Sequence, residues 1–494
     1  MSLPSRSPWA FLPTLYFAEG LPYVLVNTVS VVLCKRLGVR NEEIGLYTSL
    51  ISFPWILKML WGPLVDLTLT KRRWIVVTQL GIAAMLLLAP LTLGAQRFLA
   101  PFLLVFTAVA FLSATHDVAC DGFYMQALSQ KQQAGFVGVR TTCYRLAVIF
   151  GSGALVALAG SFETAQGSRR SLAWSFLSEN PLARAWAAAL AAGAIAYSAC
   201  ALINAFVMPH PAEQRQAGRP RDSAPFFAAL GAFFRQKRLW AILAFILLYR
   251  CGESLIAKMS VPFLLDTRAP AYEGSFTPPG GEPVHARGTL VEDAGGGTLR
   301  LEVIEPPELA GAPWSAPAAA LKRISDGGGL QISTTANGII TGTVGIIALV
   351  LGGLLGGAAI ARFGLRRCFW PMVLCLNLPN LLYVWAAHAQ PGTAAVGALV
   401  AVDQFGYGFG FTAYLVYLML ISQSTPYAAS TYAIATGLMA LGVLGAGILS
   451  GYLQAWLGYP EFFLAVCFLG LPGVLSLLWI PLPEPSGAGA KPAR

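Results

Sequence analysis

Long apolar runs, separated by short polar segments, recur along the whole chain. A helix needs about 20 apolar residues to cross a bilayer at a rise of 1.5 Å per residue. Most of the runs reach that length, so the pattern predicts an all-α membrane protein with about twelve transmembrane helices. The predicted spans cover residues 9–33, 46–68, 75–95, 99–128, 136–160, 184–208, 238–266, 332–361, 368–389, 392–422, 428–456 and 461–482.

Two polar segments are longer than the other loops, and the first of them divides the chain into halves. Residues 209–237 begin with a polar, proline-containing linker and continue with the amphipathic, basic sequence FFAALGAFFRQKR. We expect a helix on the inner membrane surface there, with an early start to the seventh span as the alternative. The expected organisation is a six-helix half (1–208), this linker, a second six-helix half (238–482) and a tail (483–494).

The second long polar segment, residues 267–329, interrupts the C-terminal half. It is rich in glycine, proline and acidic residues, and the stretches PVHARGTLVED and GGTLRLEVIE within it alternate apolar and polar positions. Alternation with a period of two is typical of β-strands. These two stretches resemble a β-hairpin, and we predict a small extramembrane β-rich element, inserted between the seventh and eighth helices.

Composition and charge agree with a membrane protein. Hydrophobic residues make up 56% of the chain and charged residues 11%, and the mean hydropathy is +0.63; soluble domains carry about 25% charged residues. The net charge of +10 does not indicate nucleic-acid binding, because the basic residues gather in short clusters between spans, such as Arg366–Arg367. Basic loops mark the cytoplasmic side. We expect an inner-membrane protein with both termini in the cytoplasm and residues 267–329 outside.

No enzymatic, metal or cofactor site is expected. The eight cysteines lie in or beside apolar runs, and none form a CxxC pair. The sequence contains no Walker, GxSxG or HExxH motif, so neither ATP-driven transport nor hydrolase activity is indicated. We expect a monomer whose partners are the lipid bilayer, a small-molecule substrate and protons.

Ionisable residues inside apolar runs are costly and are therefore functional candidates. The acids gather in spans 1, 4, 7 and 10, and the candidates for proton coupling are Asp117, Asp121, Glu19, Glu253 and Asp403. Asp117 and Asp121 stand four residues apart, so they share one helix face, and their repulsion favours proton binding near neutral pH. Arg145 could pair with either, and a structural ion-pair network bracing helices 4 and 5 is the alternative.

Cations, amides and tyrosines near these acids are the candidates for substrate binding. An anionic or zwitterionic ligand would meet Arg250 or Lys258, unless Arg250 and Glu253 neutralise each other at i,i+3. Tyrosines near Asp403 suit a sugar-like ligand, although each of them could instead pack in the core. The full set is Lys58, His116, Tyr124, Arg145, Arg250, Lys258, Gln404, Tyr407 and Tyr414.

A separate charged group lies at the inner end of the second span. Asp66 is followed by Lys71, Arg72 and Arg73. We expect a gating ion pair there, which locks the halves in one state and breaks in the other, with substrate contact as the alternative.

The two halves resemble each other at equivalent junctions. The second and third spans are joined by GPLVDLTLTKRRW (62–74), and the eighth and ninth by GGLLGGAAIARFGLRRC (352–368). Both have small residues on the helix and then a basic turn. Two six-helix halves joined by a basic linker resemble the plan of major facilitator transporters. In that fold helices 1, 4, 7 and 10 line the central cavity, which implies that the candidate acids face it.

Particular segments are similar to the AmpG branch of that superfamily, which is close to the acetyl-CoA transporters. The resemblance implies proton-coupled import of anhydro-muropeptides, which are recycled cell-wall fragments, from periplasm to cytoplasm. The resemblance implies functional roles for the residues at matching positions, which are Lys58, Asp66, Asp117, Asp121, Arg145, Arg250 and Glu253. The similar segments are LKMLWGPLVD (57–66), SATHDVACDGFYMQAL (113–128), YRLAVIFGSG (144–153), LLYRCGESLIAKMSVPFLL (247–265) and YGFGFTAYLVYLMLIS (407–422).

Two features depart from the AmpG pattern. His116 stands where a glutamine usually precedes the first aspartate of helix 4, and residues 267–329 are not part of the ordinary family plan. One alternative is a transporter of the same fold for another solute, such as an acyl-CoA, a peptide or a siderophore. Another is a non-transporting membrane receptor that uses the insert to bind a partner. Charges on the cavity helices favour transport, because a scaffold does not need them.

Overall fold

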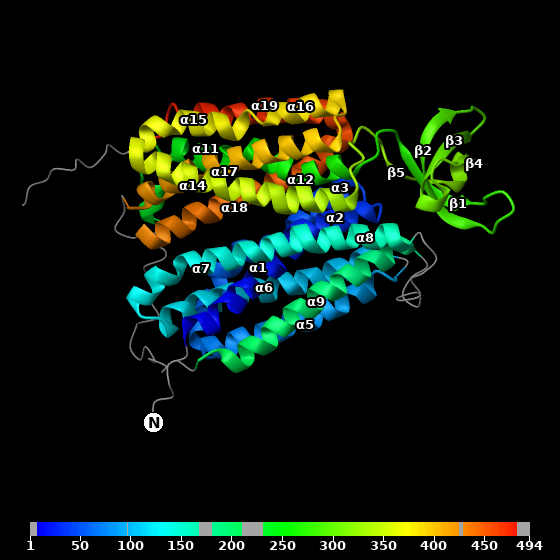
Figure 1. The fold of residues 1–494 in the computed structure, drawn as a ribbon. Helices are drawn as coiled ribbons and strands as arrows, with labels where there is room; N and C mark the ends of the chain where they lie inside the picture. Colours follow the sequence, from blue (N-terminus) through cyan, green and yellow to red (C-terminus); the bar gives the residue numbers. More distant parts are fainter. Residues whose placement is uncertain (1–6, 96, 167–179, 210–230, 424–427, 482–494) are drawn as a thin grey trace, which may run out of the picture.

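The structure is a computed structural model that describes residues 7–95, 97–166, 180–209, 231–423 and 428–481. Its helices lie side by side in two bundles, and a small sheet projects from one end of them (Figure 1). In the described part, eleven helices are long and apolar enough to span a membrane. The predicted fold class, a helical membrane protein with a small β-rich insert, is confirmed.

The N-terminal bundle is built from the first part of the chain. A short 3₁₀ turn, Pro8–Ala10, precedes the first span. Two spans continue through a π-helical turn, which separates α1 from α2 and α7 from α8. The elements are α1 (Leu12–Val24), η2 (Leu25–Val29), α2 (Ser30–Arg36), α3 (Asn41–Leu50), α4 (Phe53–Leu67), α5 (Lys71–Thr92), α6 (Leu99–Ala127), α7 (Gln130–Val148), η3 (Ile149–Leu155), α8 (Val156–Gln166) and α9 (Pro181–Val207).

The predicted second span, 46–68, is divided into two shorter helices. Ile51 and Ser52 form a turn between α3 and α4, and Pro54 lies in the first turn of α4. Proline has no N–H to donate and its ring collides with the carbonyl four residues earlier, so it is tolerated in a first turn but not inside a helix. Neither piece alone is long enough to span, which accounts for eleven long helices where we expected about twelve.

The C-terminal bundle repeats this architecture, and its second span also contains a π-helical turn. Most of the linker, residues 210–230, lies outside the described residues, so the surface helix expected there stays a prediction. The elements are α11 (Leu239–Leu248), α12 (Cys251–Leu265), α13 (Thr334–Ile339), η6 (Ile340–Gly345), α14 (Ile346–Phe363), α15 (Leu365–Asn377), α16 (Asn380–Ala389), α17 (Thr393–Gln423), α18 (Ala428–Leu457) and α19 (Tyr459–Ser476).

The insert is an antiparallel sheet of five strands, larger than the predicted hairpin. The hairpin itself is correct, because its two strands pair with Leu290 opposite Leu301. We missed the other three strands because they are only four to six residues long, and β1 and β4 also contain glycine or proline. The strands are β1 (Ala271–Phe276), β2 (Val284–Asp293), β3 (Thr298–Glu305), β4 (Pro313–Pro317) and β5 (Lys322–Ser325), in the order β4-β3-β2-β1-β5. The sheet has its own apolar core around Leu301, Val303 and Trp314.

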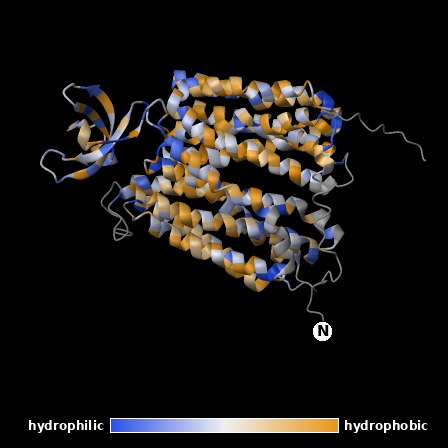
Figure 2. Ribbon diagram, turned by 180° about the vertical axis from the view of Figure 1, so that it is seen from behind, coloured by the Kyte–Doolittle hydropathy of each residue, from blue (hydrophilic) through white to orange (hydrophobic). Residues whose placement is uncertain are grey.

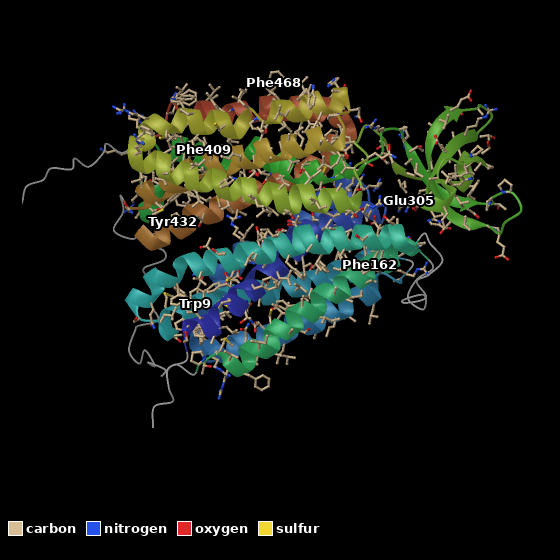
Figure 3. The ribbon with its side chains drawn as sticks, viewed as in Figure 1. Trp9, Phe162, Glu305, Phe409, Tyr432 and Phe468 are labelled. Atoms are coloured by element: carbon tan, nitrogen blue, oxygen red, sulfur yellow. The ribbon has the colours of Figure 1, made fainter. Side chains whose placement is uncertain are left out.

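The two bundles meet at the end that carries the sheet, which we call the sheet face. There α3 packs on α18, and α8 and η3 pack on α13 and η6. Glycine allows this approach: a Cβ on Gly342 would lie 2.2 Å from the backbone of Ser152 in the other half. Toward the opposite face, where Trp9 and Tyr432 lie, the bundles diverge (Figures 1 and 3). Hydrophobic residues dominate the helices, and hydrophilic ones are frequent on the sheet (Figure 2).

Candidate functional site

Five charged residues from four helices form a cluster in the N-terminal bundle, which we call the N-half cluster. Lys58 of α4 lies 3.4 Å from Asp117 of α6. Arg140 of α7 lies 2.5 Å from Asp121 of α6 and 3.8 Å from Glu19 of α1. The structure therefore brings together four predicted candidates, and it adds Arg140 as the cation that two of them share.

The identity of that cation differs from our expectation. We considered Arg145 as the partner of the helix 4 acids, but Arg145 makes no ion pair or hydrogen bond with any residue that the structure describes. Residues 140 and 145 are five positions apart, so on a helix with 3.6 residues per turn they point in different directions. Arg140 also lies over the rings of Tyr16 and Tyr124, 4.7 and 5.7 Å from their centroids. These contacts bring Tyr124 to the edge of the N-half cluster.

The N-half cluster is partly open and incompletely paired. The Asp121 side chain is 49% exposed and that of Arg140 is 33% exposed. Glu19, by contrast, is buried, and its Oε2 atom has no hydrogen-bond partner among the described residues. A buried carboxylate oxygen without a partner is energetically costly. The cluster also holds three carboxyl groups and only two cations, so binding one proton would balance its charge.

His116 is buried in a chain of polar side chains inside the same bundle. Its Nε2 atom lies 3.0 Å from Nε2 of Gln79, whose Oε1 accepts from Asn204 at 3.4 Å. Thr14 donates to Asn204 at 2.6 Å, so the chain connects α6 with α5, α9 and α1. A ligand could reach His116 only if these bonds rearranged. Its substrate-binding role stays a prediction.

A second charged group lies at the start of α12 in the C-terminal bundle. Arg250 is 2.8 Å from Glu253, and it donates to the hydroxyl of Tyr407 at 2.9 Å. Its guanidinium lies 4.6 Å from the ring centroid of Phe411. The two ionic side chains are only 12% and 14% exposed. This is the i,i+3 pair that we weighed from the sequence, and its charges balance.

Asp403 is a buried acid without a cation. It accepts hydrogen bonds from Tyr383 at 3.2 Å and from the neighbouring Gln404 at 3.0 Å. Among the described residues it has no ion pair. Gln404 is therefore engaged by Asp403, and a substrate would have to compete for its amide nitrogen.

Two further candidates lie in packed surroundings. Tyr414 is fully buried, donates to the carbonyl of Ile246 at 2.8 Å and stacks on Tyr249 with centroids 4.9 Å apart. Lys258 of α12 donates to the carbonyl of Thr48 at 3.2 Å. Because Thr48 belongs to α3, Lys258 joins the two halves near the sheet face. Neither contact brings the side chain into the N-half cluster or to Arg250.

The predicted gating group is only partly described. The side chain of Asp66 lies outside the described residues, so its ion pair stays a prediction. Arg72 donates to the carbonyls of Ala205 and Met208, at 2.5 and 3.3 Å, at the end of α9. Lys71 is buried, and its stem lies against Gly122, while Thr70 caps α5 through the backbone of Arg73. These contacts are all within the N-terminal bundle.

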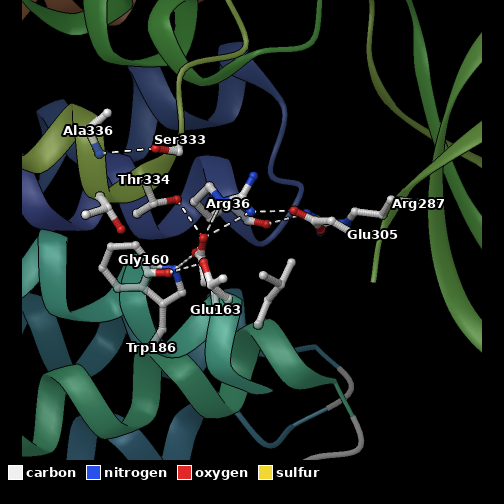
Figure 4. A network of polar contacts seen from close by, with 12 residues as sticks. Arg36, Gly160, Glu163, Trp186, Arg287, Glu305, Ser333, Thr334 and Ala336 are labelled. Carbon is white, nitrogen blue, oxygen red and sulfur yellow. Dashed lines mark hydrogen bonds and ion pairs between the residues drawn. The ribbon is translucent and has the colours of Figure 1, made fainter. Parts of the chain in front are cut away.

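Sequence reasoning missed a polar network at the sheet face (Figure 4). Arg36, at the end of α2, lies 3.1 Å from Glu163 of α8 and 2.5 Å from Glu305 of β3. Glu163 also accepts from Trp186 at 2.9 Å and from Thr334 at 2.7 Å. A basic residue at the end of span 1 and an acidic one at the end of span 5 were the available signal, but neither indicates its partner.

The charges in this network are matched. Arg287 of β2 lies 3.5 Å from both Glu305 and Glu273, and Glu273 has a second cation in Lys322 at 3.0 Å, so three cations face three carboxylates. Burial alone would raise the pKa of Glu305, but the charges of Arg36 and Arg287 outweigh it and lower the pKa below its usual value. Beside the network, Lys35 pairs with Asp266 of the C-terminal half at 2.6 Å. We call the group formed by Arg36, Glu163, Arg287, Glu305, Lys35 and Asp266 the sheet-face network.

Comparison with known proteins agrees with the fold. The sequence profile of the Major Facilitator Superfamily matches residues 10–275. The anhydromuropeptide permease of Escherichia coli strain K12 is 24% identical over 95% of this chain and 79% of its own length. The transporter named AmpG 4 of Rickettsia conorii is 18% identical over 94% of both chains. The crystal structure of the nucleoside transporter NupG superimposes with a TM-score of 0.63, at 14% identity, over 94% of this chain and 97% of that one.

Proposed function

Since this chain belongs to the Major Facilitator Superfamily, we propose that it imports anhydro-muropeptides or similar amino-sugar peptides, together with protons. The similarity to a permease named for anhydromuropeptides supports this substrate class. The buried charges of the two bundles support it further, because a peptide-bearing substrate carries both signs of charge.

The proposal depends most on the charge imbalance of the N-half cluster. Glu19, Asp117 and Asp121 outnumber Lys58 and Arg140 by one negative charge, in surroundings where charge is costly. One proton restores the balance. Arg140 is close to both Glu19 and Asp121. When one of these acids is protonated, the guanidinium can pair with the other.

The C-terminal bundle supplies the groups that we assign to substrate binding. Arg250 is held by Glu253 and Tyr407, and its guanidinium lies 4.6 Å from the ring centroid of Phe411. Cations beside aromatic faces suit a ligand with carboxylate and sugar groups.

Transport would proceed by alternating access. The halves are in contact at the sheet face and diverge at the opposite face. With the termini in the cytoplasm, as the basic loops predict, this is an inward-facing conformation. Proton and substrate binding from outside would require the sheet face to open and the opposite face to close.

The decisive experiment is uptake of labelled anhydro-muropeptide into proteoliposomes with and without an inward proton gradient. We expect accumulation above the external concentration only with the gradient. Labelled acyl-CoA and plain peptides serve as competing solutes in the same vesicles. Accumulation of acyl-CoA or of a plain peptide, without accumulation of the muropeptide, would show that the proposed substrate is wrong. Accumulation without any gradient would contradict proton coupling.

A further inference from the structure

The sheet is attached to the C-terminal bundle by a narrow neck. The two chain segments that enter and leave it are hydrogen-bonded to each other: Gly328 donates to the carbonyl of Arg268 at 2.8 Å, and Gly329 to that of Thr267 at 3.0 Å. The sheet therefore belongs covalently to the C-terminal half. Its apolar core lies within the sheet itself, so this core does not fix the sheet to the bundles.

The sheet reaches across to the N-terminal half through Arg36. The carboxylate of Glu305 binds the guanidinium of Arg36 at 2.5 Å, and Arg287 donates to the backbone carbonyl of Arg36 at 2.7 Å. Both the side chain and the main chain of one N-half residue are thus held by the sheet. On its other side Arg36 is anchored to Glu163 of its own half. Figure 3 places Glu305 at the junction of sheet and bundles.

This contact is polar and loosely packed. A cavity of 260 Å³ lies beside it, lined among others by Arg36, Glu163, Thr267 and Glu305. A smaller cavity of 40 Å³ lies on the side of Lys35 and Ile324. Interfaces within one chain allow relative motion of the parts that they join unless they are large and hydrophobic. We therefore expect that the contact of the sheet with Arg36 breaks and re-forms.

We propose that the sheet is a clasp on the outer gate, and that Glu305 and Arg287 hold the sheet face closed by gripping Arg36. The inference rests on the proposed function, because it assumes that the halves separate at this face during transport. Opening would move the end of α2 away from the C-terminal half and would break the Arg36–Glu305 and Lys35–Asp266 pairs together. Arg36 is then a gating residue that acts on the conformational equilibrium without touching substrate.

The size of the effect follows from the contacts. Hydrogen bonds between charged groups are stronger than those between neutral groups, so loss of the charge at one such contact should shift the gate equilibrium about tenfold, which corresponds to about 1.4 kcal/mol. Replacing the Glu305 carboxylate by an amide keeps the shape of the side chain and removes its charge. We expect Glu305→Gln to raise the ratio of open to closed sheet face about tenfold. Because a ligand-free protein also samples both states, the shift needs no substrate.

The test measures the gate directly. Spin labels at Ser161 of α8 and Thr393 of α17, both exposed near the sheet face, report the separation of the halves in a cysteine-free background. Distance distributions are recorded for the parent, for Glu305→Gln, and for a variant in which a Gly/Ser linker replaces residues 269–327. The matched control is Glu292→Gln, which makes the same chemical change in an exposed pair with Arg300 at 2.9 Å on the same sheet.

The clasp predicts that Glu305→Gln and the linker variant both gain the longer distance, while Glu292→Gln resembles the parent. Identical distributions in all four proteins would overturn it. The linker variant has no sheet to misfold, so it decides the question if Glu305→Gln disturbs the sheet. The readout is independent of transport. A longer distance in the variants without muropeptide uptake by the parent would support the clasp and contradict the proposed function. Muropeptide uptake by the parent without a longer distance in the variants would support the proposed function and contradict the clasp.

Discussion

The N-half cluster and the sheet-face network are built from the same residue types but differ in charge balance. In the first, Glu19, Asp117 and Asp121 share Lys58 and Arg140, and one carboxylate oxygen of Glu19 has no partner in the described part of the chain. In the second, every carboxylate has a matching cation, as Lys35 with Asp266 illustrates. A balanced network gains nothing from a proton, whereas an unbalanced one does. This difference is why we propose proton coupling for the first region and conformational control for the second.

The largest effect should come from the unbalanced cluster. Each of Asp117→Asn and Asp121→Asn removes one negative charge and so imitates the protonated state permanently. We expect both variants to lose concentrative uptake while equilibrative exchange of substrate continues. Labelled uptake and counterflow in the same proteoliposomes separate the two, with Glu292→Gln as the control. If both variants still accumulate substrate against a gradient, another acid carries the coupling, with Glu19, Glu253 and Asp403 next to be tested.

The balanced pair in the C-terminal bundle offers a contrast within the membrane. The double variant Arg250→Gln/Glu253→Gln removes both charges of this pair and leaves neither uncompensated, so it should weaken substrate binding without changing the dependence on the proton gradient. Loss of a charge-assisted contact of about 1.5–3 kcal/mol corresponds to a KM about 10- to 140-fold higher. The measurement is KM and kcat at two gradients. A change in proton coupling with an unchanged KM would contradict our proposal that the C-terminal bundle binds substrate and the N-terminal bundle couples protons.

Removing the sheet should have a smaller effect on transport. The neck hydrogen bond between Arg268 and Gly328 places the two cut ends side by side, so a short Gly/Ser linker can replace residues 269–327 without strain. We expect turnover largely intact and an apparent affinity changed by about tenfold or less, since only the gate equilibrium shifts. Complete loss of transport, in a variant present in the membrane at normal levels, would show that the sheet takes part in the transport mechanism itself.

The smallest effect concerns pH at the sheet. The lowered pKa of Glu305 means that its contacts with Arg36 and Arg287, with His285 also nearby, stabilise the docked sheet above the ordinary carboxyl pKa of about 4.3. That stability is lost only as the pH falls through the lower value in the docked state. The spin-label distances should therefore stay constant from about pH 8 to 5, and lengthen only below about pH 4. A transition near neutral pH would contradict this.

The sequence predicted what depends on local pattern. Span lengths, the β2–β3 hairpin and the shared helix face of Asp117 and Asp121 follow from periodicities of 3.6 and 2 residues. The sequence did not predict that Arg140, rather than Arg145, pairs with Asp121, because this depends on how α7 is rotated against α6. The pairing of Arg36 with Glu305 joins residues 269 positions apart, and no local rule specifies such a contact. Packing of the halves determines both.

Proton movement during substrate uptake tests the central claim most directly. A pH-sensitive dye inside proteoliposomes records acidification when anhydro-muropeptide is added outside. We predict acidification with the parent protein and with Glu292→Gln, and none with Glu19→Gln, Asp117→Asn or Asp121→Asn, although all three variants still exchange substrate. Acidification at the parent rate in all three variants would contradict the assignment of proton coupling to the N-half cluster.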